Sequence, residues 1–130
     1  EHQIYIDDYA HHPKEIEVAI RSVRDLFPNK ELTVIFQPHL FSRTRDFMDD
    51  FAKVLSFADH VMLLDIYPAR ELPIEGVTSQ VLLNKITVKN KWLYDKSKFP
   101  EVVAESSVLM TLGAGDIDKL IQPIKAYLVS

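Results

Sequence analysis

Short apolar runs alternate with stretches of helical periodicity along most of the chain. Apolar runs at 4–6, 32–36, 61–64 and 108–112 have the length of buried strands. Between them, apolar residues recur every three to four positions, most clearly over 13–27. Strands that alternate with helices favour a largely parallel sheet covered on both faces. We therefore predict an α/β, Rossmann-like fold with a mostly parallel sheet of about five to six strands, flanked by helices.

The boundaries of the strands and helices follow from this pattern and from the positions of prolines and N-cap residues. Strands are predicted at residues 4–8, 32–37, 61–66 and 107–112, and helices at 13–27, 43–58, 78–84, 97–105 and from 116 onward. Pro13 suits a first helical position, and Ser42 and Asp116 are the expected N-caps of the second and last helices. Pro123 should kink or break the last helix.

Two further local predictions can be checked directly. The inward positions of the second helix are predicted to be Phe47, Phe51, Leu55 and Ala58. Segment 86–94 fits either one strand or two short strands that turn at 90–91.

A cluster of polar, reactive residues follows each of four predicted strands. These clusters are Asp-Asp-Tyr-Ala-His-His-Pro at 7–13, Gln-Pro-His-Leu-Phe-Ser-Arg-Thr-Arg at 37–45, Asp-Ile-Tyr-Pro-Ala-Arg-Glu at 65–71 and Gly-Ala-Gly-Asp at 113–116. In an open α/β sheet, ligands bind in the crevice at the carboxyl ends of parallel strands. Four such strand ends predict one ligand site.

Composition narrows the function classes. A length of 130 residues suits one domain, and 47% hydrophobic with 26% charged residues is ordinary for a globular protein. The net charge of −4 with scattered basic residues does not indicate a nucleic-acid surface. No apolar run has the length of a membrane span, no secretory signal pattern opens the chain, and there is no cysteine. We expect a cytoplasmic protein that binds neither nucleic acid nor membrane.

The histidines and acidic residues of the first two clusters could suggest a metal site. His11 and His12 follow Asp7 and Asp8, and His39 ends the next strand. Adjacent residues leave a strand end in different directions, and no His-x-x-x-His or Glu-x-x-His spacing occurs. We therefore predict no protein-built metal site. The alternative role for one of these histidines is to cap or pack at the turn.

Arg43 and Arg45 lie at the predicted start of the second helix. Cations at a helix N-terminus oppose the helix dipole, so we expect an anion nearby; a solvated helix start is the alternative. The glycines of 113–116 allow a tight turn and close backbone approach, but the third glycine of a dinucleotide fingerprint is absent. No phosphate-cradling Gly-x-x-x-x-Gly-Lys-Ser/Thr motif occurs in the chain.

The first two clusters resemble the signatures of the C-terminal domain of the Mur ligases, the ATP-dependent ligases of peptidoglycan synthesis. The matching residues are 7–13 and 36–45, and the weaker motifs at 65–71 and 112–117 fall in the same order. The resemblance implies that residues 1–130 form one domain, the third of a longer enzyme. The central ATPase domain and the N-terminal UDP-sugar domain of that enzyme are expected outside this chain.

The resemblance also implies an activity. The parent enzyme is expected to join L-alanine to UDP-N-acetylmuramate through an acyl phosphate, and the isolated domain is expected to be inactive. ATP and Mg²⁺ are the expected cofactors, bound mainly by the central domain, on which this domain would pack. Two alternatives stay open: a related ligase that attaches a preformed peptide to the same sugar, and a non-catalytic, flavodoxin-like binding module.

Site residues carry over by position. Asp8 is expected to contact the ATP ribose, and His11 to have a catalytic role by offsetting charge on the acyl phosphate. Arg43 is expected to bind the carboxylate of alanine through its guanidinium fork. The remaining residues expected to bind alanine are Tyr9, His11, His39 and Gly113.

One departure concerns Leu40, because many relatives carry arginine at this position. A clamp of two arginines in its usual form is therefore not expected here. His39, Arg45 and Arg70 are the candidates to compensate, and the sequence does not distinguish among them.

Overall fold

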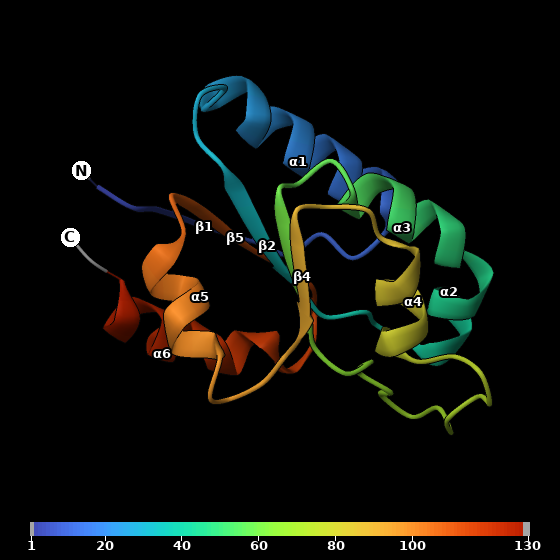
Figure 1. Ribbon diagram of the computed structural model, residues 1–130. Coiled ribbons are helices and arrows are strands. Elements are labelled where there is room, and N and C mark those ends of the chain that lie inside the picture. The colour runs from blue at the N-terminus through green and yellow to red at the C-terminus, as the bar shows by residue number, and fades with distance from the viewer. Residues whose placement is uncertain (1, 129–130) are drawn as a thin grey trace.

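A five-stranded, wholly parallel sheet forms the centre of the protein, seen in a computed structural model that describes residues 2–128 (Figure 1). The strands are β1 (Ile4–Asp8), β2 (Leu32–Phe36), β3 (His60–Leu63), β4 (Asn90–Leu93) and β5 (Val108–Leu112), in the spatial order β1-β5-β2-β3-β4. The predicted α/β fold with a parallel sheet is confirmed. Segment 86–94 contributes one strand rather than two.

Helices cover both faces of this sheet. They are α1 (Pro13–Leu26), α2 (Phe41–Asp46), α3 (Met48–Leu55), α4 (Ser79–Lys85), α5 (Phe99–Glu105), the 3₁₀ helix η1 (Asp116–Leu120) and α6 (Ile121–Tyr127). The helices α1 to α4 lie on one side, and α5 and α6 lie on the other (Figure 1). Each side has its own apolar core against the sheet.

The central strands β2 and β5 are buried at every position because helices cover both of their faces. In β2, Val34 and Phe36 belong to the core under α1, α3 and α4, whereas Ile35 between them belongs to the core under α5 and α6. Side chains of a strand alternate between faces, so a strand covered on both sides is apolar at most positions. The exceptions in these two strands are the buried threonines Thr33 and Thr111. This explains why the continuous apolar runs predicted β2 and β5.

The parallel register places four strand ends at one edge of the sheet. Asp8 of β1 lies opposite Leu112 of β5, and Leu112 lies opposite Phe36 of β2. Phe36 in turn lies opposite Leu63 of β3. The polar segments that follow these strands therefore start side by side.

The second helix differs from the prediction. A single helix over 43–58 was expected, but α2 ends at Asp46 and α3 begins at Met48. Phe47 between them leaves helical geometry (φ −119°, ψ 23°) and is 36% exposed, with its ring against His12. The other predicted inward residues, Phe51, Leu55 and Ala58, are buried as expected.

Two predicted N-caps are also wrong. The helix α2 begins one residue before Ser42, with Leu40 as its N-cap residue, and Ser42 bonds elsewhere. Asp116 lies inside η1, after Gly115. Pro123 is the third residue of α6, in the first turn, where a backbone N–H has no partner within the helix. The last helix is interrupted just before α6, where the 3₁₀ helix η1 ends.

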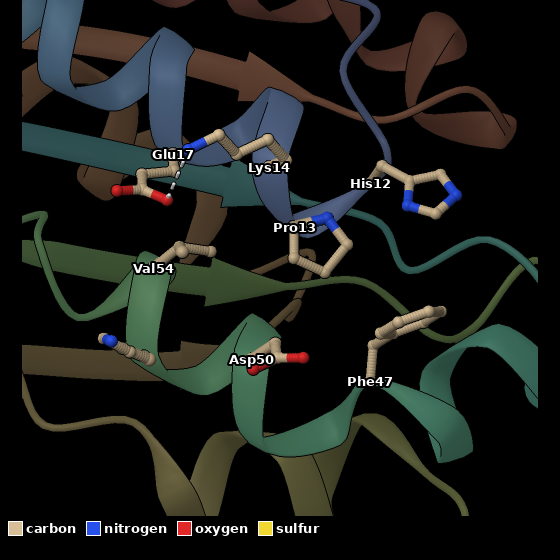
Figure 2. Close-up of a pocket in the computed structure, with 8 residues that line it drawn as sticks. His12, Pro13, Lys14, Glu17, Phe47, Asp50 and Val54 are labelled. Carbon is tan, nitrogen blue, oxygen red and sulfur yellow. Dashed lines mark ion pairs between the residues drawn. The ribbon is translucent and has the colours of Figure 1, made fainter.

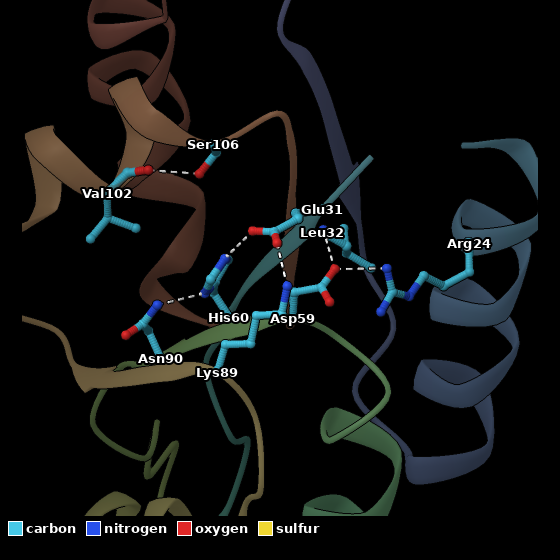
Figure 3. A network of polar contacts seen from close by, with 9 residues as sticks. All are labelled: Arg24, Glu31, Leu32, Asp59, His60, Lys89, Asn90, Val102 and Ser106. Carbon is cyan, nitrogen blue, oxygen red and sulfur yellow. Dashed lines mark hydrogen bonds and ion pairs between the residues drawn. The ribbon is translucent and has the colours of Figure 1, made fainter. Parts of the chain in front are cut away.

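A polar network closes the opposite edge of the sheet, at the amino ends of the strands (Figure 3). The Asp59 carboxylate accepts hydrogen bonds from the Leu32 N–H (2.8 Å) and from Arg24 Nη1 of α1 (2.7 Å). Arg24 Nε also donates to the Phe57 carbonyl (3.0 Å). Burial alone would raise the pKa of Asp59, but the bonds from Arg24 and Leu32 outweigh it and lower the pKa.

Glu31 links the strands β3 and β4 from the chain just before β2. Its carboxylate accepts from Lys89 and from His60 Nε2 (2.8 Å), and these bonds, Lys89 first, lower its pKa to about 2. Asn90 in turn contacts His60 Nδ1 (3.2 Å). The network is exposed around Glu31 and partly buried around Asp59, so we expect Asp59 to contribute more to stability.

We predict that Asp59→Ala lowers the free energy of unfolding by roughly 1–3 kcal/mol, because it leaves the Leu32 N–H and Arg24 unpaired. A carboxyl whose pKa is lowered by folding stabilises the protein above its ordinary pKa and loses this effect as the pH falls. Urea unfolding at pH 7 and below pH 3.8 measures both effects. The loss should be full at pH 7 and should shrink under acid. Asp25→Asn, at an exposed position, is the matched control.

Candidate functional site

The segments that follow β1, β5, β2 and β3 are tied to one another by their backbones. The Gly113 N–H donates to the Asp8 carbonyl (3.3 Å), and the Gln37 N–H donates to the Leu112 carbonyl (3.1 Å). Beyond β2 and β3, His39 and Tyr67 form an isolated parallel bridge. The structure thus brings the four predicted clusters to the same edge.

Asp8 lines a groove between the sheet edge and α1. Its Oδ1 accepts from the Ala10 N–H (2.8 Å), and Oδ2 has no hydrogen bond within residues 2–128. The groove has a volume of about 630 Å³, and its apolar wall consists of Ile6, Val18, Ala19, Val23 and Met110. A carboxylate oxygen without a partner beside an apolar wall suits a ligand that carries hydroxyl groups as well as a flat apolar part.

Glu15 fixes the loop that carries His11 and His12. One carboxylate oxygen of Glu15 accepts both backbone N–H groups, each at 3.2 Å, as the N3 residue of a capping box. These bonds, His11 first, lower the pKa of Glu15. His11 Nδ1 donates to the Tyr9 carbonyl (3.0 Å) and lies 3.8 Å from Glu15. The Tyr9 side chain itself is 65% exposed.

The two adjacent histidines point in different directions. The ring of His11 lies 5.9 Å from the ring of His39, whereas the ring of His12 lies 5.6 Å from that of Phe47. Figure 2 shows His12 and Phe47 at one end of a second hollow of about 300 Å³, between the start of α1 and α3. An ion pair of Lys14 with Glu17 (3.8 Å) lies on its rim. His11 is thus the member of the pair that joins the predicted site.

His39 lies at the centre of the cluster. Its ring stacks on Tyr67, with ring centres 5.4 Å apart and an angle of 22° between the planes. Its Nδ1 is buried and has no hydrogen-bond partner. Burial lowers the pKa of His39, and so do Arg43 and His11, whereas Glu71 acts to raise it. A neutral imidazole with one buried, unpaired nitrogen is therefore held at this edge.

Arg43 presents a second buried polar atom without a partner. Its Nη1 makes no hydrogen bond, and Arg43 lies in α2, four positions after His39 in the chain. A buried polar group without a partner typically costs about 1–3 kcal/mol, so native proteins rarely keep one without a reason. A ligand with acceptor oxygens could complete the bonding of both atoms.

The other two arginines considered for binding a carboxylate, Arg45 and Arg70, are ion-paired or exposed. Arg45 pairs with Asp46 (2.9 Å), and Arg70 is exposed. The anion expected at the start of α2 is supplied by the chain itself, since Glu71 accepts from the Ser42 N–H (3.0 Å) and the Ser42 hydroxyl. These bonds, with the hydroxyl first, lower the pKa of Glu71. Ser42 is therefore engaged by a residue 29 positions away and does not cap its own helix.

The glycine turn after β5 packs closely on the ends of β2 and β3. Gly113 has φ 137°, and a Cβ there would lie 3.0 Å from the Gln37 carbonyl. A Cβ on Gly115 would lie 2.7 Å from Tyr67 Cγ and 2.8 Å from Gln37 Oε1. The predicted close backbone approach is present, but its immediate partners are protein atoms.

The sequence interpretation gave no role to Gln37 or Tyr67. Gln37 is 3% exposed, accepts from the Ile117 N–H (2.8 Å) and donates to the Asp65 carbonyl (3.1 Å). A buried amide at the end of an apolar strand must find partners, and this is the one signal that could have revealed it. Within residues 2–128, no three His, Asp or Glu residues are grouped so that they could hold a metal ion.

Comparison with known proteins now identifies the family. The model of the Mur ligase, glutamate ligase domain matches residues 1–117. The chain belongs to the Mur ligase family. A UDP-N-acetylmuramate–L-alanine ligase of Cytophaga hutchinsonii is 54% identical over 124 residues, which is 94% of this chain and 27% of that protein. The chain therefore spans about a quarter of the length of this curated relative.

Solved structures of Mur ligases share the fold. The UDP-N-acetylmuramate–alanine ligase of Thermotoga maritima has a TM-score of 0.68 at 27% identity, over 94% of this chain and 26% of that chain. A murein peptide ligase of Psychrobacter arcticus has a TM-score of 0.70 at 15% identity, over 99% of this chain and 29% of that chain, and shows the fold alone. None of the helices within residues 2–128 is long and apolar enough to cross a membrane.

The unpaired atoms of the site lead to a prediction about stability. Arg43→Met removes a buried, unpaired polar atom and keeps an apolar stem, so we expect the free energy of unfolding to stay equal or to rise by up to about 1 kcal/mol. Thermal and urea unfolding of the 130-residue chain measure this change. Arg24→Met, which breaks the bonds to Asp59 and Phe57, is the control and should destabilise. A loss of more than about 1 kcal/mol for Arg43→Met would show that Arg43 is bonded within the chain.

Proposed function

We propose that this chain is the C-terminal domain of an ATP-dependent ligase that adds L-alanine to UDP-N-acetylmuramate in peptidoglycan synthesis. Relatives with this activity in their names are 54% identical over nearly the whole chain. The observation that carries the proposal is the pair of buried, unpaired nitrogens, His39 Nδ1 and Arg43 Nη1. We also propose that the whole enzyme is cytoplasmic, where its nucleotide substrates are available.

The unpaired nitrogens form the site for the carboxylate of alanine in this proposal. Arg43 offers a charged donor, and neutral His39 offers an N–H at Nδ1, so that both carboxylate oxygens receive a hydrogen bond. Leu40 supplies no second guanidinium, Arg45 is paired with Asp46, and Arg70 is exposed. His39 is therefore the residue that we assign to compensate for Leu40.

The groove beside Asp8 forms the nucleotide side of the site. The unpaired Asp8 Oδ2 can accept from the hydroxyls of the ATP ribose, and the apolar wall of the groove offers contact to the base. The chain contains no phosphate-binding loop, and we assign the phosphates and Mg²⁺ mainly to the central domain of the longer enzyme.

The chemistry joins two poorly reactive groups through activation. ATP phosphorylates the sugar carboxylate, the amine of alanine attacks the resulting acyl phosphate, and ADP and phosphate leave. Tyr9 and His11 line the Asp8 groove, and the ring of His11 also lies 5.9 Å from that of His39, where His11 would offset negative charge on the acyl phosphate. The turn at Gly113 would border the alanine pocket. Closure of this domain over the central domain would exclude water from the acyl phosphate.

The two alternatives have less support. A peptide-adding ligase shares the fold, as the Psychrobacter arcticus structure illustrates, but at 15% identity that likeness extends to the fold only. A non-catalytic binding module is disfavoured because the relatives that match nearly the whole chain are named as ligases.

The two halves of the site should respond separately to mutation in the full-length enzyme. Arg43→Ala should raise the KM for alanine by roughly thirtyfold or more with the ATP constant little changed, because a charged hydrogen bond in a closed site is lost. Arg43→Lys should restore only part of the loss. Asp8→Ala should raise the ATP constant roughly ten- to hundredfold and spare alanine.

Initial rates at varied alanine and varied ATP measure these constants. Arg45→Ala is the control for charge at the start of α2 and should change neither constant much. If Arg45→Ala removes the alanine dependence while Arg43→Ala leaves it intact, Arg45 binds the carboxylate and the assignment to Arg43 is wrong.

The 130-residue chain alone should fold but not ligate. It contains both apolar cores and the parallel sheet, which predicts cooperative unfolding, whereas the phosphate-binding loop is absent. Alanine-dependent ADP release should be undetectable with UDP-N-acetylmuramate, ATP and Mg²⁺. Measurable ligation by this chain would contradict the assignment of the phosphates to another domain.

A further inference from the structure

The motif at 65–71 has no role in the proposed function, although it lies at the centre of the site. Tyr67 is the residue of this motif that contacts His39. Its backbone N–H donates to the Pro38 carbonyl (2.8 Å), and its carbonyl accepts from the Leu40 N–H (2.8 Å). These two bonds bracket His39, so the chain beyond β3 holds the chain beyond β2 on both sides of the imidazole.

The ring of Tyr67 lies between His39 and the glycine turn. One contact is the stack on the imidazole, at 5.4 Å between ring centres. The other is Gly115, where a Cβ would lie 2.7 Å from Tyr67 Cγ and 2.8 Å from Tyr67 Cβ. These are the stiff inner atoms of the side chain, so the ring could not keep its position beside any residue other than glycine. The Tyr67 hydroxyl makes no hydrogen bond within residues 2–128, which leaves the flat ring as the contacting group.

We infer that Tyr67 is a positioning residue, which holds the His39 imidazole so that its buried Nδ1 faces the carboxylate of alanine. The inference rests on the proposed function for the ligand, but the stack and the glycine contact stand without it. The charged and titratable groups that face His39 are His11, Arg43 and Glu71. The ring of Tyr67 stacks on the imidazole of His39, whereas the ring of His11 is tilted by 58° to it.

The variants Tyr67→Phe, Tyr67→Leu and Gly115→Ala separate the ring from the hydroxyl. Tyr67→Phe keeps the ring and is the matched control. Tyr67→Leu keeps apolar bulk without a flat face, and Gly115→Ala keeps the tyrosine but displaces its ring. Circular dichroism and thermal melting first establish that each variant is folded.

The first readout is the titration of His39 by NMR in the 130-residue chain. Burial is the main cause of the lowered pKa of His39, so Tyr67→Leu and Gly115→Ala should move the pKa up toward its ordinary value of 6.5. Tyr67→Phe should leave it in place. An unchanged His39 pKa in both Tyr67→Leu and Gly115→Ala would overturn the inference.

The second readout is the KM for alanine in the full-length enzyme. Tyr67→Leu and Gly115→Ala should raise it roughly three- to tenfold, the scale of one lost ring contact, with the ATP constant unchanged and Tyr67→Phe normal. The positioning role would be overturned if the KM for alanine stays normal in Tyr67→Leu although the pKa of His39 rises in that variant. Arg43→Ala, measured in parallel, tests the alanine site independently, so a failure of the proposed function is distinguished from a failure of this inference.

Discussion

The parallel register of the sheet is the constraint on which the site depends. Because Asp8, Leu112, Phe36 and Leu63 lie in successive register across four strands, the chain leaves each strand at the same edge. The segments after Asp8 and Leu112 are far apart in sequence, yet they start on neighbouring strands, one strand spacing from each other. A shift of one residue would turn every side chain to the other face and separate the two apolar cores from their helices.

The site itself is stabilised less than its surroundings. At the amino edge, the Asp59 carboxylate accepts hydrogen bonds from a backbone N–H and from an arginine. At the carboxyl edge, His39 and Arg43 each keep a buried nitrogen without a partner. The cores on both faces of the sheet and the tight glycine turn after β5 hold this unfavourable arrangement in place. Such a division, with a well-bonded frame and an incompletely bonded edge, is expected where a ligand supplies the missing bonds.

Much of the frame could be predicted from the sequence, because apolar periodicity reports burial directly. The runs at 32–36 and 108–112 gave their strands, and Pro13 marked the start of α1 correctly. N-cap prediction from the local sequence failed where a residue distant in the chain forms the hydrogen bonds instead. Ser42 has the right chemistry for an N-cap, but Glu71 takes both its N–H and its hydroxyl.

The arrangement within the site depends on tertiary contacts that no local pattern encodes. The break at Phe47 accompanies a contact with His12, 35 positions earlier in the chain. The resemblance to the Mur ligases implies roles for His39 and Arg43, yet only the structure shows that their nitrogens lack partners and that Tyr67 stacks on the imidazole.

The central claim is that His39 Nδ1 and Arg43 Nη1 together bind the carboxylate of alanine. A crystal structure of the full-length enzyme with alanine, UDP-N-acetylmuramate and a non-hydrolysable ATP analogue tests it most directly. We expect carboxylate oxygens within about 2.7–3.2 Å of both nitrogens, with the His39 ring still stacked on Tyr67. A carboxylate held by Arg45 or Arg70, with both nitrogens still unpaired, would contradict it.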